Sequence, residues 1–193
     1  MQIEYEATFP NIDKNEIRER LRKLGAELIR PEFLQKRVNY YFPSGHEIKG
    51  GWLRVRDEAD KITLSLKVIN DGGIEEQKEI CLHINSFNDA RLLLENMGCR
   101  NKSYQETKRE IWKLDGVEIC IDEWPYVEPF VEVEGKSEDE VKNVSEKIGF
   151  NYDDARFCAV DTLYNEKYGI SKDDINNTKE ITFKIENPFL KIK

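Results

Sequence analysis

Short segments with alternating apolar and polar residues recur along most of this chain. A period of two places successive side chains on opposite faces of a strand, so each segment predicts a half-buried β-strand. Eight are predicted: Gln2–Pro10, Glu27–Phe42, Trp52–Asp57, Lys61–Ile69, Glu75–Ile84, Lys102–Leu114, Val117–Glu123 and Pro129–Gly135. Eight such strands can close an antiparallel β-barrel, which removes exposed sheet edges and leaves an inward-facing residue at every second position.

Three segments with helical spacing of apolar residues interrupt the strands. We predict helices over Lys14–Leu24, Phe87–Met97 and Glu138–Ile148. Each follows a side chain that can cap its first turn, namely Asp13, Ser86 or Ser137. Each ends at a glycine that easily adopts the left-handed conformation: Gly25, Gly98 or Gly149. The apolar face of each helix is expected to pack on the outside of the barrel, so the predicted fold class is α+β.

The strands and helices contain an internal repeat. Ile3–Glu6, a helix and Gly25 follow one another in the same way as Val131–Glu134, a helix and Gly149. This pattern predicts a duplicated strand-helix-strand unit that closes into one pseudo-symmetric barrel over residues 1–150. Residues 151–193 are predicted to be an appendage packed on the barrel, with a helix over Arg156–Tyr168 and a strand over Ile181–Ile185.

Composition excludes several classes of protein. The net charge of −8 argues against a general basic surface for nucleic acid. A zinc site is not expected, because the four cysteines are far apart and only two histidines could assist them. The acidic N-terminus does not resemble a signal peptide, and no apolar run of about 20 residues could cross a membrane. We therefore expect no membrane association and a cytoplasmic protein with reduced thiols.

Two Glu-x-Glu strands are the first candidates for chemistry. Glu4 and Glu6 share one strand face, as do Glu132 and Glu134. If both strands expose their acidic faces to water, the glutamates have no special role. Their equivalent places in the repeat favour a polar interior instead, where converging carboxylates repel one another unless cations join them. Oxygen ligands of this kind suit Mg²⁺ or Mn²⁺.

Basic side chains on other strands complete the predicted interior. Arg54 and Arg56 share a face of one strand, while Lys67 and Arg109 lie on two others. Arginine offers a planar fork to phosphate oxygens and lysine a mobile charge, so this set suits a polyphosphate bridged by metal. Two acidic residues would alternate with the cations and hold them in place: Glu79 and Asp122.

Further basic residues are candidates for the same ligand. Lys36 or Arg37 and Lys108 lie on long strands, where a bulge can change which face a residue occupies. We assign Lys36 and Lys108 to the predicted ligand site. The alternative for all of these charges is a set of ion pairs between strands on the surface.

These motifs, in this order, resemble the CYTH or triphosphate tunnel metalloenzyme superfamily, and most of all its class IV adenylate cyclase-like branch. The resemblance covers about residues 1–150. Three motifs lie in the first half of the region: the Glu-x-Glu strand (Glu4, Glu6), the Leu-Arg-x-Arg strand (Arg54, Arg56) and the Leu-Lys strand (Lys67). Three more lie in the second half: an Arg after the second helix (Arg109), an Asp before a turn (Asp122) and the Phe-x-Glu-x-Glu strand (Phe130, Glu132, Glu134).

The resemblance implies an eight-stranded tunnel that binds a metal and a triphosphate. Glu4, Glu6 and Glu134 would bind Mg²⁺ or Mn²⁺, and the triphosphate would be bound by Arg54, Arg56, Lys67 and Arg109. The resemblance also suggests a homodimer. This chain departs from the family at two positions where lysine is usual, Thr8 and Thr107. Lys36 and Lys108 are the expected replacements for those charges.

Several functions fit such a tunnel. Conversion of ATP to cyclic AMP and pyrophosphate is the first, and hydrolysis of tripolyphosphate or thiamine triphosphate is the second. Both need electrostatic stabilisation more than covalent chemistry, so one tunnel can serve either. A non-catalytic module that binds nucleotide or polyphosphate is a third reading, motivated by Thr8 and Thr107. A structural protein without ligand is a fourth.

Overall fold

The computed structural model describes residues 1–70 and 73–191. Within these ranges the chain forms ten β-strands of one sheet: β1 (Gln2–Ile3), β2 (Tyr5–Phe9), β3 (Glu27–Tyr41), β4 (Gly51–Asp57), β5 (Ile62–Ile69), β6 (Gln77–Ile84), β7 (Arg100–Leu114), β8 (Val117–Glu123), β9 (Phe130–Gly135) and β10 (Glu180–Ile181). The same ranges contain five α-helices: α1 (Lys14–Lys23), α2 (Phe87–Asn96), α3 (Glu138–Ile148), α4 (Asp161–Tyr168) and α5 (Lys172–Asn177). Three short 3₁₀ helices complete them: η1 (Ile74–Glu76), η2 (Tyr152–Asp154) and η3 (Pro188–Lys191).

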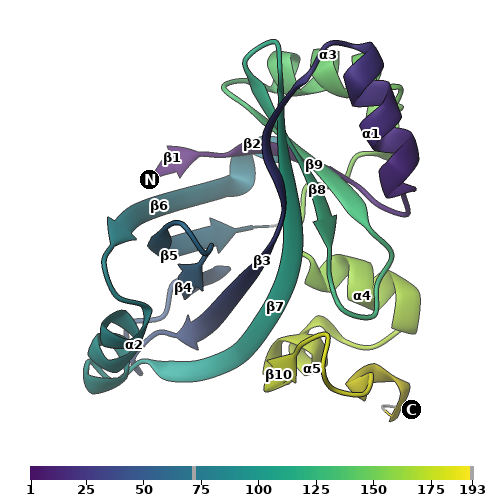
Figure 1. Cartoon of the computed structure of the whole chain (residues 1–193). Coiled ribbons are helices and arrows are strands. Elements are labelled where there is room, and N and C mark those ends of the chain that lie inside the picture. Colours follow the sequence, from purple (N-terminus) through teal and green to yellow (C-terminus); the bar gives the residue numbers. More distant parts are fainter. Residues whose placement is uncertain (71–72, 192–193) are drawn as a thin grey trace.

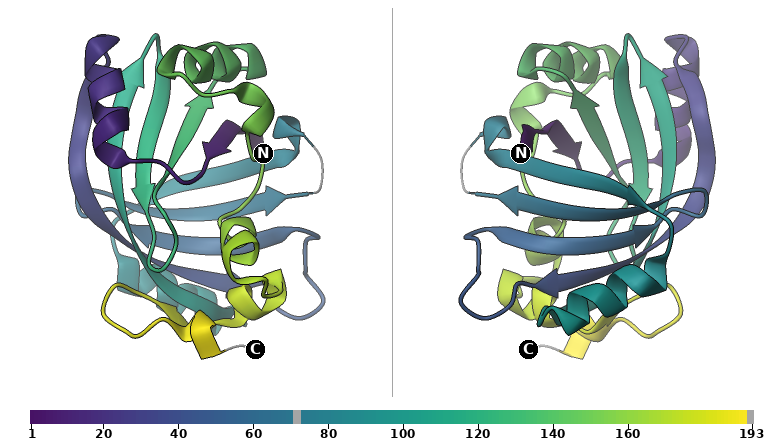
Figure 2. Two further views of the ribbon diagram at one scale, coloured as in Figure 1. Left: turned by 90° about the vertical axis from the view of Figure 1, so that its right-hand side faces the viewer. Right: turned by 90° about the vertical axis from the view of Figure 1, so that its left-hand side faces the viewer.

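The sheet curls into a nearly closed antiparallel barrel (Figures 1 and 2). Its strand order is β1-β6-β5-β4-β3-β7-β8-β9-β2, and β1 and β2 come from the same N-terminal stretch. β1 pairs with β6 and β2 pairs with β9, so this stretch connects both edges of the sheet. The backbone N–H of Glu4, between the two strands, donates to the carbonyl of Gln77 at 2.9 Å. The predicted antiparallel barrel with helices outside is confirmed.

The number of strands differs slightly from the eight predicted. The N-terminal strand is interrupted at Glu4, because the stretch leaves one edge of the sheet and joins the other at this point. β10 is an additional two-residue strand that pairs in parallel with β7. Alternation predicted a strand that begins at Ile181, but it reveals neither the interruption at Glu4 nor the parallel pairing with β7, since both depend on the partner strand.

The outer face of the barrel is apolar where the helices cover it. One cluster joins Val131 and Ile119 of the sheet to Leu21 of α1 and Val144 of α3. A second cluster packs α2 against Val38 and Tyr40 of β3 and Val55 of β4, and Figure 1 shows α2 at the opposite end of the barrel from α1 and α3. Since the alternate residues of these strands point inward, the interior is left to polar side chains.

The three helices expected in the barrel region begin as predicted. Their N-caps are the predicted side chains, and each accepts a hydrogen bond from a backbone N–H in the first turn: Asp13, Ser86 and Ser137. The glycines beyond them have positive φ angles of 74°, 88° and 98°: Gly25, Gly98 and Gly149. Local capping signals therefore identified these helices well.

The C-terminal segment differs more from its prediction. The helix expected over Arg156–Tyr168 begins only at Asp161, because Arg156 exchanges two backbone hydrogen bonds of 2.9 Å with Thr8 of β2. The strand expected over Ile181–Ile185 is limited to β10. Beyond it the carbonyls of Thr182 and Ile185 accept hydrogen bonds from the Tyr126 hydroxyl at 2.6 and 2.7 Å. Apolar side chains of the C-terminal segment form a cluster with Trp124 and Phe130, and this cluster packs the segment against the barrel.

No helix within the described residues is both long enough and apolar enough to span a membrane.

Candidate active site

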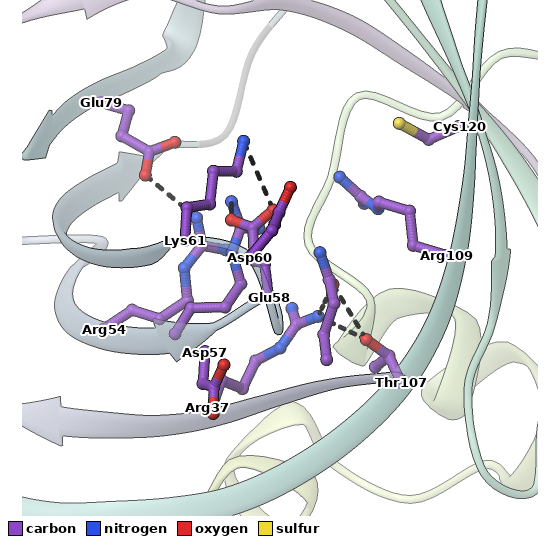
Figure 3. A network of polar contacts seen from close by, with 12 residues as sticks. Arg37, Arg54, Asp57, Glu58, Asp60, Lys61, Glu79, Thr107, Arg109 and Cys120 are labelled. Carbon is purple, nitrogen blue, oxygen red and sulfur yellow. Dashed lines mark hydrogen bonds and ion pairs between the residues drawn. The ribbon is translucent and has the colours of Figure 1, made fainter. Parts of the chain in front are cut away.

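Strand pairing places basic side chains on the inner face of β3, β4, β5 and β7. Residues directly opposite each other in an antiparallel pair share a face. Arg56 lies opposite Arg37, and Arg54 lies opposite Ser65, which is buried. Figure 3 shows Arg37, Arg54 and Arg109 reaching into the space that the sheet encloses. The interior is therefore strongly cationic on this side.

Arg37 is a buried cation without a matching carboxylate. Its side chain donates to Oε1 of Gln35 at 2.8 Å and to Oγ1 of Thr107 at 2.6 Å, and its guanidinium lies 4.6 Å from the ring centroid of Trp124. Among the described residues no carboxylate forms an ion pair with it, and its Nε has no hydrogen-bond partner. Burial and then repulsion from Arg54 hold the pKa of Arg37 well below its usual range. An anion bound here would relieve that cost.

The other interior cations each have an acidic partner. Arg54 Nη2 lies 3.0 Å from Glu79, and Lys67 Nζ lies 2.9 Å from Glu4. Burial raises the pKa of Glu79, but Arg54 and its other partners outweigh burial, so the pKa lies below its usual range. Glu79 was predicted to hold a cation in this way, whereas Glu4 was predicted as a metal ligand and its pairing with Lys67 was not foreseen.

Arg109 connects the cationic and acidic sides of the barrel. Its Nη2 lies 2.5 Å from Asp122 on β8 and 2.5 Å from Glu132 on β9. Arg56 has a separate partner at the end of β4, because its Nη2 lies 2.8 Å from Glu58. The single guanidinium of Arg109 thus bridges two carboxylates, Asp122 and Glu132.

The four glutamates of the two Glu-x-Glu motifs gather on neighbouring strands. Glu6 lies opposite Glu134 in the β2–β9 pair, and its side chain is buried. Burial and then repulsion from Glu132 raise the pKa of Glu6 well above its usual range. The pKa of Glu4 is raised to about 7, chiefly by burial and against the influence of Lys67. This crowding of carboxylates is the condition that a divalent cation would relieve.

The four glutamates do not form a cluster with the geometry of a metal site in this structure. Within residues 1–70 and 73–191, no group of three or more His, Cys, Asp or Glu is arranged to hold an ion. Glu4 instead faces Lys67, and Glu132 faces Arg109. The donor set nevertheless fits a hard cation, because buried carboxylates on adjacent strands repel one another and supply oxygen ligands only.

A cavity of about 580 Å³ joins the two sets of charges. Its lining includes Glu6 and Glu132 from the acidic set and Arg37, Arg54 and Lys67 from the basic set. A smaller cavity of about 270 Å³, between the β8–β9 turn and α4, contains none of these residues. The larger cavity is of the size that small-molecule sites have in proteins.

Most predicted site residues are brought together on the inner face. They are Glu4, Glu6, Arg54, Arg56, Lys67, Glu79, Arg109, Asp122, Glu132 and Glu134. Lys36 and Lys108 are not among them, which corrects the assignment made from sequence. Lys36 is exposed, and Lys108 pairs with Glu123 at 2.7 Å. Both occupy outward positions because their neighbours Arg37 and Arg109 point inward.

Arg37 also explains how the interior accommodates Thr107. Thr107 is buried on β7, and the guanidinium of Arg37 on the neighbouring strand reaches its hydroxyl. The positive charge beside Thr107 therefore comes from Arg37 and not from Lys36 or Lys108. Thr8, the other departure, is buried opposite Glu132 in the β2–β9 pair.

Several lining residues were missed in the sequence. Asn39 and Gln105 line the cavity beside Arg37, and their side chains form a 3.0 Å hydrogen bond. Arg37 was the alternative to Lys36 in the sequence analysis, and Asn39 lies two residues further along the same strand, so choosing Arg37 would have placed Asn39 inside as well. Residues 157–161 also line the cavity, but no pattern in the sequence predicts this, because it depends on where the C-terminal segment packs.

Comparisons with known proteins agree with this architecture. The family model for the CYTH domain matches residues 2–162. Among curated proteins, no sequence matches the chain.

Solved structures with the same fold come from distant organisms. A conserved hypothetical protein from Pyrococcus furiosus is 23% identical, with a TM-score of 0.69 over 83% of this chain and 99% of that one. A proposed adenylate cyclase from Vibrio parahaemolyticus is 15% identical, with a TM-score of 0.72 over 85% of this chain and 98% of that one. A proposed adenylyl cyclase from Hippeastrum, described as having a dominant triphosphatase activity, is 13% identical, with a TM-score of 0.56 over 87% of this chain and 97% of that one. At these identities the likeness shows the fold.

Proposed function

Because the chain belongs to the CYTH domain family, we propose that it binds a triphosphate-bearing small molecule inside the barrel and processes it with the help of Mg²⁺ or Mn²⁺. The observation that carries this proposal is Arg37, a buried guanidinium that lacks a carboxylate partner among the described residues and lies among other arginines. A polyphosphate would supply the missing negative charge in a dry setting, where such contacts are strong.

The basic side chains have distinct roles in this proposal. Arg37, Arg54 and Lys67 line the cavity and bind phosphate oxygens, while Glu79 holds the guanidinium of Arg54 in position. Because Arg37 and Arg54 are fixed before the ligand arrives, they stabilise charge that develops on a leaving phosphate without reorganising. Arg56 and Arg109 lie behind them on the same inner face.

The glutamates would hold the cation. Glu6, Glu132 and Glu134 lie on β2 and β9, and Glu4 lies between β1 and β2. A bound divalent ion would add Lewis-acid polarisation of the phosphate and would activate the attacking oxygen. Release of Glu132 from Arg109 and of Glu4 from Lys67 would free these carboxylates for the ion and the two cations for the phosphates.

Cyclisation of ATP is the reaction we put forward first. The ribose 3′-hydroxyl would lose its proton to solvent and its oxygen would bond to the α-phosphorus. The bond from that phosphorus to the bridging oxygen would break, and pyrophosphate would leave. The cationic cluster is suited to the charge that accumulates on pyrophosphate. The resemblance in fold to the Vibrio parahaemolyticus protein supports this choice.

Hydrolysis of a terminal phosphate is the second candidate. Water would lose a proton to solvent and its oxygen would bond to the terminal phosphorus. The bond from that phosphorus to the bridging oxygen would break, and the shortened polyphosphate would leave. The same cations would stabilise that leaving group. The triphosphatase activity described for the Hippeastrum protein favours this reading.

Product analysis tests the proposal. The purified protein is incubated with ATP, thiamine triphosphate or tripolyphosphate, each with Mg²⁺ or Mn²⁺. We expect cyclic AMP and pyrophosphate from ATP, whereas inorganic phosphate from any of the three would identify the hydrolase instead. Arg54→Ala is expected to lower the rate by about 10²-fold or more, and the matched variant Lys36→Ala on the outer face is expected to leave it unchanged. Metal-dependent binding without any product would replace the enzyme with a non-catalytic triphosphate sensor, and no binding at all would overturn the proposal.

A further inference from the structure

The cavity extends beyond the phosphate-binding side chains to one end of the barrel. At this end β3 and β5 finish at Tyr41 and Ile69, and β4 begins at Gly51. Gly51 and Ile69 both line the cavity. A triphosphate held by Arg37, Arg54 and Lys67 would leave this end available for whatever group the triphosphate carries.

The C-terminal segment forms a wall of that end. Residues 157–161 line the cavity where they lead from the Arg156–Thr8 bridge to α4, and Lys172 and Asn176 line it from α5. α5 lies beside the barrel end, since the Tyr41 hydroxyl donates to Oδ1 of Asn177 at 2.6 Å. The CYTH match ends at residue 162, so α5 lies beyond the part of the chain that the family shares. Residues 157–161 of the wall thus lie within the family match, and only the part from α5 lies outside it.

Three lysines line this end of the cavity, Lys49, Lys102 and Lys172, and among them lie groups that suit an organic substituent. Nδ2 of Asn176 donates to Oδ2 of Asp161 at 2.7 Å, which fixes an amide and a carboxylate side by side. Oδ1 of Asn39 is buried and has no hydrogen-bond partner among residues 1–70 and 73–191, so it can accept a hydrogen bond from a ligand. Trp52, Val160 and Ile69 add apolar surface between these polar groups. Apolar walls with a few placed donors and acceptors are typical of sites for heterocyclic ligands.

We propose that this wall makes the site selective for a nucleoside triphosphate over an inorganic polyphosphate, with Asn176 and Asp161 of the C-terminal segment and Asn39 of β3 binding the nucleoside. This inference rests on the proposed function, because it assumes that the triphosphate occupies the cationic part of the same cavity. Asn176 is a specificity-determining residue in this scheme and takes no part in the chemistry.

Calorimetric titration with ATP and with inorganic tripolyphosphate, both in Mg²⁺, tests the proposal. Any turnover appears as a steady signal after each injection and is subtracted. The wild-type protein is expected to bind ATP at least about tenfold more tightly than tripolyphosphate, which corresponds to one or two net hydrogen bonds. Asn176→Ala is expected to weaken ATP binding about tenfold and to leave tripolyphosphate binding within about twofold of wild type. Asn143→Ala, which changes an exposed asparagine of α3 outside the cavity lining, serves as the matched control and should change neither.

The outcomes separate this inference from the proposed function. Equal affinities for the two ligands in the wild type, or an equal effect of Asn176→Ala on both, would overturn the selectivity proposal while leaving triphosphate binding intact. Failure of both ligands to bind would overturn the proposed function. If Asn176→Ala lowers the melting temperature of the free protein, Asn39→Ala provides the same comparison from the opposite wall.

Discussion

Arg37 shows how a side chain can be unfavourable for the fold and useful for the site. It is buried, it lies opposite Arg56 in the sheet, and its hydrogen bonds are to the neutral side chains of Gln35 and Thr107. Gln35 and Thr107 also bond to each other at 3.1 Å, so neither depends on Arg37 for a partner. Charge clusters of this kind are commonly retained for function at a cost in stability.

Arg37→Met is therefore expected to raise stability and to weaken binding. Methionine has a similar length and removes the repulsion from Arg54 and Arg56, which should increase the free energy of unfolding by about 1 kcal/mol. Loss of the charge should weaken tripolyphosphate binding about tenfold or more. Denaturant unfolding and calorimetry measure the two effects. Lys36→Met, one residue away and exposed, should change neither by much, and a destabilised Arg37→Met that binds normally would contradict this account.

Glu58 gives a pH-dependent prediction. Burial raises its pKa, but the ion pairs with Arg56 and Lys61 outweigh burial and lower the pKa below its ordinary value of 4.5. A carboxylate with a lowered folded-state pKa stabilises the protein above its unfolded-state pKa, and this stabilisation is lost as the pH falls through the folded-state pKa. Glu58→Gln should therefore lower the free energy of unfolding by about 2 kcal/mol at pH 7, and the difference from wild type should shrink as the pH falls below about 4.5.

Denaturant unfolding of both proteins between pH 3 and 7 gives this comparison. Asp60→Asn is the matched control, since its carboxylate pairs with Arg30 at the surface and should contribute less than about 1 kcal/mol. A difference between wild type and Glu58→Gln that stays constant with pH would show that the charge of Glu58 contributes nothing.

For single residues, the sequence predicted most of the candidate site, because the alternation of apolar and polar residues indicates which side chains of a strand share a face. Arg54, Arg56, Lys67 and Arg109 reach the interior as the pattern predicted. The assignment of Lys36 was wrong, because the sequence does not show which strand pairs with β3 or in which register. In the structure Arg37, and not Lys36, lies opposite the inward-facing Arg56.

Among the elements, the local signals were strongest for the helices of the barrel region. Capping side chains and glycines depend on neighbours in the sequence, so α1, α2 and α3 begin as predicted. α4 and β10 were placed less well, because the residues before α4 bind the edge of β2 and those after β10 bind Tyr126. Contacts distant in sequence override the local pattern at both places.

The C-terminal element is expected to be held to the barrel by one aromatic cluster. Phe189 is 2% exposed and contacts the rings of Tyr126, Tyr164 and Tyr168. Phe189→Ala should lower the free energy of unfolding by about 3 kcal/mol, because it leaves a cavity in this cluster. Leu190→Ala is the control, since Leu190 is 67% exposed and its truncation should cost less than about 0.5 kcal/mol. Chemical denaturation measures both, and equal effects would show that the cluster does not hold the segment.

At the scale of the whole molecule, the barrel has its apolar face outside and its polar face inside. Helices cover the outer face, which frees the interior to collect charges that would be costly in an ordinary core. The sequence predicted this inversion, since the Glu-x-Glu strands alternate with apolar residues that need cover. It did not predict that residues 157–161 and α5 would complete the cavity, because no periodic pattern marks which surface a terminal segment covers.

A crystal structure of the protein grown with tripolyphosphate and Mn²⁺ tests the central claim most directly. Anomalous scattering locates the manganese independently of the phosphate density. We expect the phosphates beside Arg37, Arg54 and Lys67, and manganese beside Glu6 and the two glutamates of β9, with Glu132 turned away from Arg109. Two results would contradict the claim that the interior is a metal-dependent triphosphate site. The first is phosphate on the outer face of the barrel, and the second is manganese bound away from these glutamates while the ion pairs of Glu4 and Glu132 persist.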